Sequence, residues 1–293
     1  KLTTPTRLEN ITPLWLTKAL HSRRSQIDVY VTDFSYEIIG IGKGFMNQTA
    51  RLSIEYNRDS GDFPLSLIAK LSAVDPLLRQ LSDLFQCGQR EIRYYQEIAY
   101  DSGISVPTIY YSSIDESTND RILLMEDMSD ARQGDSVAGC SLSDVELAVD
   151  QLAMFHHTWW QSPRLSTWKW LSLRDAETAI YKKMYPDAWK LFVRIAGKEM
   201  PDTLRTIGDR LGQNIPEIKT RLSTPPRTIT HGDYRLDNCF LDPGHPARPL
   251  VVIDWEFCSI GRGPFDVASF INEAFQPDQR KLQEMPLLHR YHS

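Results

Sequence analysis

Cysteine is scarce in this chain, with four residues among 293. No two cysteines stand close enough together for a C-x-x-C metal clamp, and four over this length do not make a disulfide framework. We therefore expect reduced, mostly buried thiols in a cytoplasmic protein. Glycine and proline, with 15 and 17 residues, are too few for a collagen-like or low-complexity chain.

Long hydrophobic segments are absent as well. The longest unbroken apolar runs have about four residues, as at 122–125 and 250–253, whereas a membrane-spanning helix needs about 20. We therefore expect no membrane partner. No basic segment followed by an apolar one occurs near the start, so no signal peptide is expected. Because the chain has no initiator Met and ends within a helical pattern, we expect it to be trimmed at one end or both.

Basic charge is not in excess, because 33 Lys and Arg residues face 38 Asp and Glu residues and the net charge is −5. This balance argues against a nucleic-acid-binding surface spread over the whole protein, although it allows a local basic pocket for a phosphorylated ligand. Hydrophobic residues (41%) and charged residues (24%) are near globular averages. The length allows two domains or one large one.

The first part of the chain has the patterns of β-strands. Alternating apolar and polar residues between turn-forming residues predict strands. The expected strands are Tyr36–Gly42, Gln48–Tyr56, Ser66–Ser72, Val106–Ser112 and Arg121–Glu126. The first two flank a glycine-bearing turn, as in a hairpin, and one main helix is expected at about 86–100.

After Asp127 the helical period dominates. Ser143-Asp144-Val145-Glu146 has the form of a capping box, in which Ser and Glu side chains bind the first free amides of a helix. Further elements are expected as helices at about 186–198 and 202–222, short strands at 228–230 and 250–253, and a last helix from about Phe265. Strands first and helices second predict an α+β fold with two lobes.

The strongest chemical signal is the segment His231-Gly232-Asp233-Tyr234-Arg235-Leu236-Asp237-Asn238. Asp233 and Asn238 stand five positions apart, and Asp254 follows sixteen positions later at the end of an apolar strand. Phosphoryl transfer needs a carboxylate that accepts the proton of an attacking hydroxyl, and two oxygen ligands that hold Mg²⁺ against nucleotide phosphates. Asp233 fits the first role, and Asn238 and Asp254 fit the second.

This motif, followed by Val251-Val252-Ile253-Asp254-Trp255-Glu256, resembles the aminoglycoside phosphotransferase and choline kinase superfamily, and its ecdysteroid-kinase-like branch in particular. The resemblance implies a protein-kinase-like fold: a nucleotide-binding lobe (1–128) with an antiparallel sheet and one main helix, and a mostly helical catalytic and substrate-binding lobe (129–293). It also implies that the γ-phosphate of ATP is transferred, with Mg²⁺, to a hydroxyl group of a small molecule.

Upstream segments extend the resemblance. Gly42 and Gly44 lie in a turn that could cover nucleotide phosphates, since a Cβ would keep the backbone amides away from the oxygens. Lys70, within an apolar strand, resembles the lysine that holds the α- and β-phosphates, and Glu91 resembles the glutamate that pairs with it. Alone, each residue would be interpreted as an ordinary hairpin glycine or a solvated charge. Their order ahead of the main motif favours the kinase interpretation.

Other parts of the site are also implied by the resemblance. The backbone groups of Glu126 and Met128 would pair with the adenine edge in a hinge between the lobes. Arg235 either stabilises the transferred phosphate or pairs with a nearby acid. His231 and Asp266 are expected to be architectural, with Asp266 bracing the catalytic loop.

Alternative functions stay open at this stage. A pseudokinase of the same fold would hold nucleotide without transfer, although Lys70, Asp233, Asn238 and Asp254 are all present. Metal-dependent phosphoester hydrolysis would need more His and Asp ligands than the motif around His231 offers.

The acceptor is the least specified part of the reaction. Aminoglycosides are polycations and would need carboxylates at the acceptor site, to which Asp237 and Glu256 could contribute. Choline would need an aromatic box with an acid, which the sequence does not reveal. The ecdysteroid-kinase-like resemblance favours a bulkier, more apolar hydroxylated natural product. The sequence specifies neither the oligomeric state nor a choice between ATP and GTP.

Overall fold

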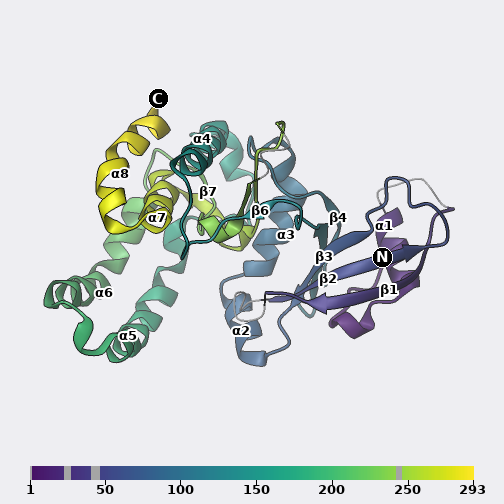
Figure 1. Ribbon diagram of the computed structural model, residues 1–293. Helices are drawn as coiled ribbons and strands as arrows, with labels where there is room; N and C mark the ends of the chain where they lie inside the picture. Colours follow the sequence, from purple (N-terminus) through teal and green to yellow (C-terminus); the bar gives the residue numbers. More distant parts are fainter. Residues whose placement is uncertain (1, 23–27, 41–46, 242–245) are drawn as a thin grey trace.

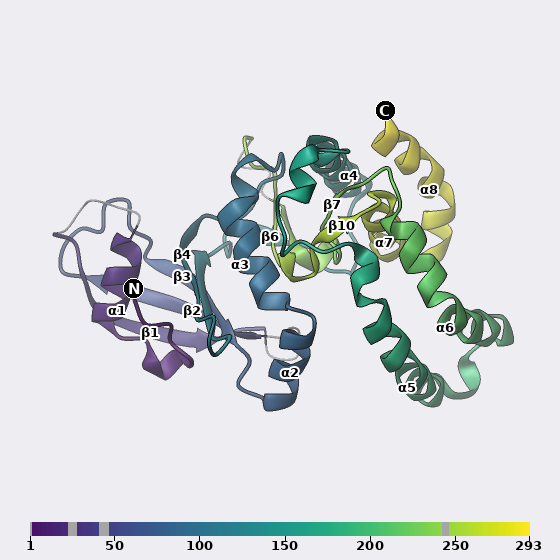
Figure 2. The same cartoon turned by 180° about the vertical axis from the view of Figure 1, so that it is seen from behind.

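An antiparallel sheet of five strands forms one end of the molecule, and helices form the other (Figures 1 and 2). The computed structural model describes residues 2–22, 28–40, 47–241 and 246–293. In the sheet the strands lie in the order β1-β2-β3-β5-β4 and neighbours are antiparallel. Their bounds are β1 Val31–Ile38, β2 Asn47–Tyr56, β3 Ser66–Ser72, β4 Ile109–Ile114 and β5 Arg121–Glu126.

The two faces of the sheet pack against different partners. Ile122 and Leu124 of β5 belong to a buried cluster with Trp15 and other residues of helix α1 (Pro13–His21). The alternate residues Leu123 and Met125 belong to a second cluster, which extends into the helical lobe. This alternation follows from the two-residue period of a strand. Helix α3 (Cys87–Glu97) lies on this second side, between the sheet and the helical lobe (Figures 1 and 2).

The helical lobe is built around helix α4, whose buried residues recur at helical spacing: Val145, Val149, Leu152, Phe155 and Trp159 are each at most 1% exposed. The α-helices of this lobe are α4 Leu142–Trp159, α5 Thr178–Ala196, α6 Asp202–Ser223, α7 Pro264–Ala274 and α8 Pro277–His292. Helix α2 (Pro76–Leu84) comes earlier in the chain, between β3 and α3. Short strands form two small sheets: β6 Arg132–Gln133 with β8 Cys239–Leu241 and β9 Leu250–Val252, and β7 Thr228–Thr230 with β10 Ser259–Gly261.

The architecture confirms the predicted α+β, two-lobed, kinase-like fold, and β3, β5 and β7 occupy the residues predicted for them. The first hairpin differs, because β1 already begins at Val31, and β4 begins at Ile109 rather than at Val106. Gly42 and Gly44 lie outside the described residues. Within the described part of the chain, no helix combines the length and apolar character required to cross a bilayer.

The capping box of α4 is formed by different residues from those predicted. Ser141 has an extended backbone and caps the helix, while Ser143 is already helical. The Oγ of Ser141 accepts a hydrogen bond from the Asp144 amide at 3.2 Å, and the Asp144 side chain accepts one from the Ser141 amide at 3.3 Å. The sequence matches the pattern twice, and the extended backbone of Ser141 decides which copy forms the cap.

Two helix boundaries differ from the prediction. Pro186 favours a helix start at 186, but α5 begins at Thr178 and carries this proline in its interior. The single last helix expected from Phe265 is two helices, because α7 ends at Ala274 and Pro277 opens α8.

Helices α5 and α6 form a projecting pair (Figure 1) that is held together by aromatic rings over glycines. Tyr185 and Trp189 of α5 stack with ring centroids 6.2 Å apart. The indole of Trp189 donates a hydrogen bond to Asp209 at 2.7 Å, and its ring covers Gly208. An added Cβ at Gly208 would lie 2.1 Å from that ring. The close approach of the two helices therefore requires glycine at this position.

We expect Gly208→Ala to lower the free energy of unfolding by about 1–3 kcal/mol, because the ring of Trp189 is held on both sides and an overpacked contact must move it. At an open helix position the same change would raise the free energy of unfolding by about 1 kcal/mol. A decrease would therefore show that Trp189 packs closely on Gly208. Denaturant unfolding measures it, with Gln213→Ala on the exposed side of α6 as control. Equal or higher stability of Gly208→Ala would contradict the close packing.

Candidate active site

The His231–Asn238 segment leaves β7 as a loop whose start is fixed by a buried carboxylate. Asp266, in the first turn of α7, is fully buried and accepts hydrogen bonds from the backbone amides of His231 at 2.6 Å and Gly232 at 3.0 Å. Gly232 has a φ of 91°, and a Cβ there would lie 2.2 Å from the carbonyl oxygen of Phe257. Glycine is therefore required at this point of the loop.

His231 connects this loop to the strand that precedes Asp254. Its Nδ1 accepts the amide hydrogen of Asp233 at 3.2 Å, so its Nε2 donates to the carbonyl oxygen of Ile253 at 2.9 Å. The ring is buried and lies 4.4 Å from the ring of Trp255. Burial lowers the pKa of His231, and the charge of Asp266 offsets only part of this effect. The geometry is that of a neutral, architectural histidine.

Asp233 and Asn238 face each other across the loop. The amide Nδ2 of Asn238 donates to the backbone oxygen of Asp233 at 2.9 Å and to its carboxylate at 3.1 Å. Asn238 is only 7% exposed. Because its nitrogen is used in this way, the amide oxygen is left to ligate a cation. The amide of Ile253 donates to the carbonyl oxygen of Asn238 at 3.0 Å, which holds the loop beside the segment leading to Asp254.

Lys70 lies between two carboxylates from different parts of the chain. Its Nζ contacts the oxygens of Glu91 at 2.8 and 3.0 Å and the Oδ1 of Asp254 at 2.9 Å. The Lys70 and Glu91 side chains are 13% and 3% exposed. Burial alone would lower the pKa of Lys70, but the charges of Asp254 and Glu91 raise it above its usual value. The ammonium group therefore stays charged beside the loop that carries Asp254.

Asp254 is positioned by an unusual backbone and by aromatic packing. It has a φ of 69°, in the left-handed region that non-glycine residues rarely adopt. The next residue, Trp255, is fully buried and stacks on Tyr94 of α3 with ring centroids 3.7 Å apart. The stacking joins Asp254 to the same helix that carries Glu91, so both carboxylates around Lys70 depend on α3.

Glu256 is a site residue whose ligand role the sequence pattern alone did not predict. Carboxylate oxygens of Glu91, Asp254 and Glu256 lie within 4.8 Å of one another. Burial and the charge of Asp254 raise the pKa of Glu256 to about 8, and its Oε2 accepts a hydrogen bond from Asn47 at 3.2 Å. Oxygen donors of this kind suit Mg²⁺. A signal is present in the sequence, since Glu256 stands two positions after Asp254.

Two of the predicted site residues have side chains that pair elsewhere. Arg235 binds Asp237 at 2.7 Å, and its side chain is 40% exposed. Glu126 accepts hydrogen bonds from Arg248 at 2.9 Å and from the Thr108 amide at 2.8 Å. The Glu126 side chain is thus engaged, and its backbone amide also donates a hydrogen bond to the carbonyl oxygen of Thr108 at 2.9 Å.

The segment after Glu126 turns back on itself. The carbonyl oxygen of Met128 accepts a hydrogen bond from the amide of Ala131 at 3.0 Å. This leaves the Met128 amide as the group of that residue that would meet the adenine edge.

A cavity of about 220 Å³ opens beside Asp233. Its other lining residues are Arg174, Glu177, Tyr181, Gly232 and Phe257. The sequence pattern predicts none of the first three, because they belong to no motif and reach the catalytic loop only through the packing of α5 and the turn before it. A hydroxyl group in this cavity would have direct access to Asp233, so the cavity is the candidate acceptor site.

The two lobes, the charged cluster around Lys70 and the Asp233–Asn238 loop define a kinase-like protein, and the class of small-molecule kinases in particular. The chain belongs to the ecdysteroid kinase-like family, whose model matches residues 41–293. This result confirms the resemblance and the class of enzyme predicted from the sequence.

Solved structures share the fold. Wild-type aminoglycoside 2'-phosphotransferase-IIIa in complex with GDP has a TM-score of 0.53 and 15% identity, over 97% of this chain and 84% of that chain. Ethanolamine kinase of Plasmodium vivax has a TM-score of 0.54 and 16% identity, over 83% of this chain and 62% of that chain. At this level of identity the similarity shows the fold alone.

Curated relatives match a smaller part of the chain. Acyl-CoA dehydrogenase family member 11 of Pongo abelii and that of Homo sapiens are each 30% identical over 98 residues, which is 33% of this chain. The match spans only 12% of the length of those relatives.

Proposed function

We propose that this protein transfers the γ-phosphate of ATP to a hydroxyl group of a small hydroxylated molecule in a Mg²⁺-dependent reaction. The observation that carries this proposal is that the Lys70–Glu91 pair, Asp254 and the Asp233–Asn238 loop lie together in the folded chain. Lys70 is held by Glu91 and contacts Asp254, while Asp254 follows a residue bonded to the Asp233–Asn238 loop. A cation for phosphates, oxygen ligands for a metal and a carboxylate beside a cavity are the parts that phosphoryl transfer needs.

On the nucleotide side, the Lys70 ammonium would bind phosphate oxygens while Glu91 keeps it oriented. The backbone of Glu126 and Met128 would pair with adenine, and Gly42 and Gly44 would lie over the phosphates. The assignments of Lys70 and the hinge are supported by the place of β3 and β5 side by side in the sheet, whereas that of Gly42 and Gly44 rests on the sequence motif. The choice of ATP is the family-based expectation.

The residues present fit a magnesium ion. Asn238 offers an amide oxygen, and Asp254 and Glu256 offer carboxylate oxygens. When bound, Mg²⁺ would neutralise charge that develops on the transferring phosphate. The raised pKa of Glu256 supports this assignment, because a cation beside its carboxylate would relieve the burial of its charge.

On the acceptor side, Asp233 would orient the hydroxyl and accept its proton as the oxygen attacks the γ-phosphorus. A new oxygen–phosphorus bond then forms, the bond from the γ-phosphorus to the β,γ-bridging oxygen breaks, and ADP leaves. Asn238 keeps the Asp233 carboxylate in place for this step. Arg235 has N–H groups beyond those bound to Asp237, with which it would stabilise the transferred phosphate.

The lobe boundary and the location are further parts of the proposal. We place the boundary between residues 128 and 129, because β5 ends at Glu126 and the next strand, β6, pairs with β8 of the helical lobe. All four cysteines are free thiols, which supports a cytoplasmic location.

Calorimetric titration of ATP, with and without Mg²⁺, tests the nucleotide site in the wild type and in Asp254→Ala. We expect Mg²⁺-dependent binding in the wild type and a Kd at least about tenfold higher in the variant, since one metal ligand and one partner of Lys70 are lost. Asp187→Ala, an exposed carboxylate on α5, is the matched control. Binding that ignores both Mg²⁺ and Asp254→Ala would contradict the proposed function.

A further inference from the structure

The cavity beside Asp233 contains a buried cation that no carboxylate of the described residues contacts directly, although the charges of Asp266 and Glu177 act on it from farther away. Arg174 lines this cavity and is only 6% exposed. Its guanidinium donates hydrogen bonds to the hydroxyl groups of Ser259 at 3.0 Å and Thr230 at 3.3 Å. No carboxylate of the described residues lies within ion-pair distance of Arg174, and its Nε has no hydrogen-bond partner among them. A buried charge of this kind is costly unless a partner neutralises it.

Glu177, one of the two acidic residues of the cavity lining, is already shared by two other cations. Glu177 contacts the guanidinium of Arg90 at 2.5 Å and the Nζ of Lys219 at 3.8 Å. The side chains of all three are at most 12% exposed. Burial and the charges of Arg174 and Arg90 lower the pKa of Lys219 to about 8, because their effect is larger than the opposing effect of the Glu177 charge. Positive charge therefore exceeds negative charge on this side of the cavity.

Two aromatic faces around the cavity are also occupied. The Nζ of Lys219 lies 3.7 Å from the ring centroid of Tyr181, and the guanidinium carbon of Arg174 lies 3.7 Å from that of Phe265. A quaternary ammonium or an amine acceptor would need such a face, or a free carboxylate, in order to bind. Of the two aromatic residues that line the cavity, Tyr181 and Phe257, the protein's own Lys219 already covers Tyr181, so a cationic acceptor would meet a like charge there.

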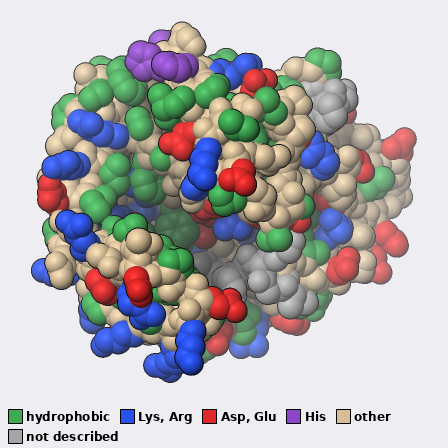
Figure 3. Space-filling model, turned by 60° about the vertical axis from the view of Figure 1, so that its left-hand side comes forward, with side chains coloured by type: hydrophobic (Ala, Val, Ile, Leu, Met, Phe, Trp, Pro, Cys, Tyr) green, Lys and Arg blue, Asp and Glu red, His purple; other side chains and the backbone are tan. Residues whose placement is uncertain are grey.

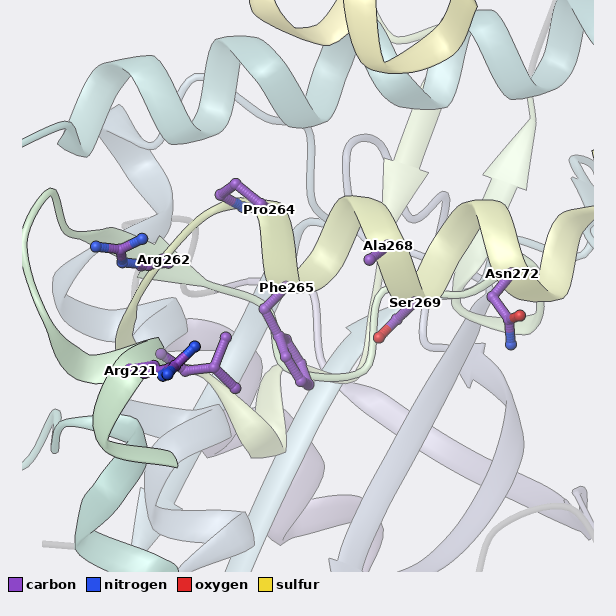
Figure 4. Close-up of a pocket in the computed structure, with 8 residues that line it drawn as sticks. Arg221, Arg262, Pro264, Phe265, Ala268, Ser269 and Asn272 are labelled. Atoms are coloured by element: carbon purple, nitrogen blue, oxygen red, sulfur yellow. The ribbon is translucent and has the colours of Figure 1, made fainter. Parts of the chain in front are cut away.

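Phe265 also lies beside two further arginines, of which Arg221 pairs with Glu217 at 2.6 Å. A second cavity of about 650 Å³ is lined by Arg221, Arg262, Phe265, Ser269 and Asn272 among others, with no acidic residue in its lining. In Figure 4 the α7 side chains of Phe265, Ser269 and Asn272 project from one side of the helix, and both arginines lie near its start.

Basic side chains gather on part of the surface, although the chain as a whole has a net charge of −5. Figure 3 shows Lys and Arg side chains along the lower left of one face, interspersed with Asp and Glu side chains. Helix α5 contributes the cations Lys182, Lys183, Lys190 and Arg194 against Asp187 as its acidic residue.

Two carboxylates that a polycationic acceptor could use are engaged elsewhere. Asp237 binds Arg235 and accepts a hydrogen bond from Ser136. Glu256 lies in the cluster with Asp254 and Glu91. Neither belongs to the lining of the cavity beside Asp233.

We propose that the acceptor is a hydroxylated anion whose anionic group, such as a carboxylate, is bound by Arg174 and Lys219 while its hydroxyl group faces Asp233. This inference rests on the proposed function and names the acceptor class of the same site. The anion supplies a direct ion pair, which no carboxylate of the described residues makes with Arg174. The hydroxyl group is then held at the Asp233 end of the cavity for transfer.

Acceptors with the same hydroxyl-bearing skeleton and an anionic, neutral or cationic group beside it test this class. One series is mandelate, methyl mandelate and 2-amino-1-phenylethanol; a larger one is cholate, methyl cholate and the corresponding 24-amine. Transfer from radiolabelled ATP is measured for each. We expect kcat/KM for at least one acid to exceed that of its ester and amine by tenfold or more. A preference for an ester or an amine, or no transfer to either acid while Mg²⁺-dependent ATP binding is intact, overturns the anionic class but leaves the nucleotide site standing.

Variants at Lys219 make the test residue-specific. Lys219→Met removes the charge and is expected to raise KM for the acid about tenfold, with KM for its ester, the Kd for ATP with Mg²⁺ and the unfolding temperature unchanged. Lys219→Arg keeps the charge and is expected to restore the preference for the acid. Lys190→Met, on the exposed part of α5, is the control. Equal effects of Lys219→Met on acid and ester would overturn the assignment.

The pH profile provides a second readout. The charged groups that face Lys219 are Arg174, Glu177 and Arg90, with Tyr181 beneath its ammonium. Because the pKa of Lys219 is about 8, its charge is present below this pH and lost above it. We expect kcat/KM for the acid to fall above about pH 8 in the wild type and to fall less in Lys219→Arg, since kcat/KM reports the free enzyme. Identical profiles would count against Lys219 as the anion-binding residue.

Discussion

Asp233→Asn is expected to reduce phosphoryl transfer by about 10²–10⁴-fold and to leave the binding of ATP and Mg²⁺ unchanged. The amide has nearly the size of the carboxylate, and its oxygen can still accept the hydrogen bond that Asn238 donates. It cannot accept the proton of an attacking hydroxyl. The loss should therefore appear in kcat, measured as product formed from labelled ATP, while the calorimetric Kd for ATP stays at the wild-type value.

Comparing the activities of the wild type and Asp233→Asn also distinguishes an enzyme from a pseudokinase. Asp278→Asn, at a side chain that is 98% exposed, should retain full activity. Full activity of Asp233→Asn would show that another group accepts the proton. A wild type that binds ATP with Mg²⁺ but transfers phosphate to no hydroxyl compound would instead favour the pseudokinase alternative.

Asp266→Ala is expected to cause the largest loss of stability, about 3–5 kcal/mol. Asp266 is fully buried and accepts hydrogen bonds from the amides of His231 and Gly232 and from the Nε2 of His156 at 3.2 Å. Alanine would leave all three donors without a partner inside the protein. Denaturant unfolding followed by intrinsic fluorescence measures the loss. A change below about 1 kcal/mol would mean that the loop does not depend on this carboxylate.

The pH dependence of stability provides an independent check on Asp266. Burial would raise its pKa, but hydrogen bonding to His156 and nearby positive charge lower it below the usual value. A carboxyl with a depressed folded-state pKa stabilises the protein above its unfolded pKa of about 3.9. That stabilisation is lost as the pH falls through the folded pKa. The acid limb of the stability profile should therefore flatten in Asp266→Asn, which keeps the shape of the side chain and removes its charge.

Local periodicity in the sequence predicts part of the fold. The bounds of β3 and β5 follow from short apolar runs between turn residues, and Lys70 is placed opposite Leu123 by the pairing of those strands. Helix boundaries are less predictable where one signal has two interpretations. Pro186 can open a helix or lie within one, and only the packing of α5 on α6 decides between these positions.

The candidate site also has a part that the sequence predicts and a part that it does not. Asp233, Asn238 and Asp254 lie in contiguous motifs, so their residue types and spacing are enough to indicate phosphoryl transfer. Arg174 and Lys219 belong to no motif, and the cavity that Arg174 lines forms only when α5 and the turn before it pack beside the catalytic loop. Long-range packing of this kind leaves no periodic trace in the sequence. The acceptor side is therefore visible only in the folded chain.

The self-contained packing of α5 on α6 has an evolutionary consequence. The pair is held together by its own aromatic and glycine contacts, and it supplies Tyr181 and Lys219 to the acceptor side. The residues proposed to bind nucleotide and metal lie on other elements. If the acceptor binds as we propose, substitutions in this pair would change which compound is selected without disturbing the groups proposed to bind ATP. New acceptor preferences would then need few mutations, all within one helical pair.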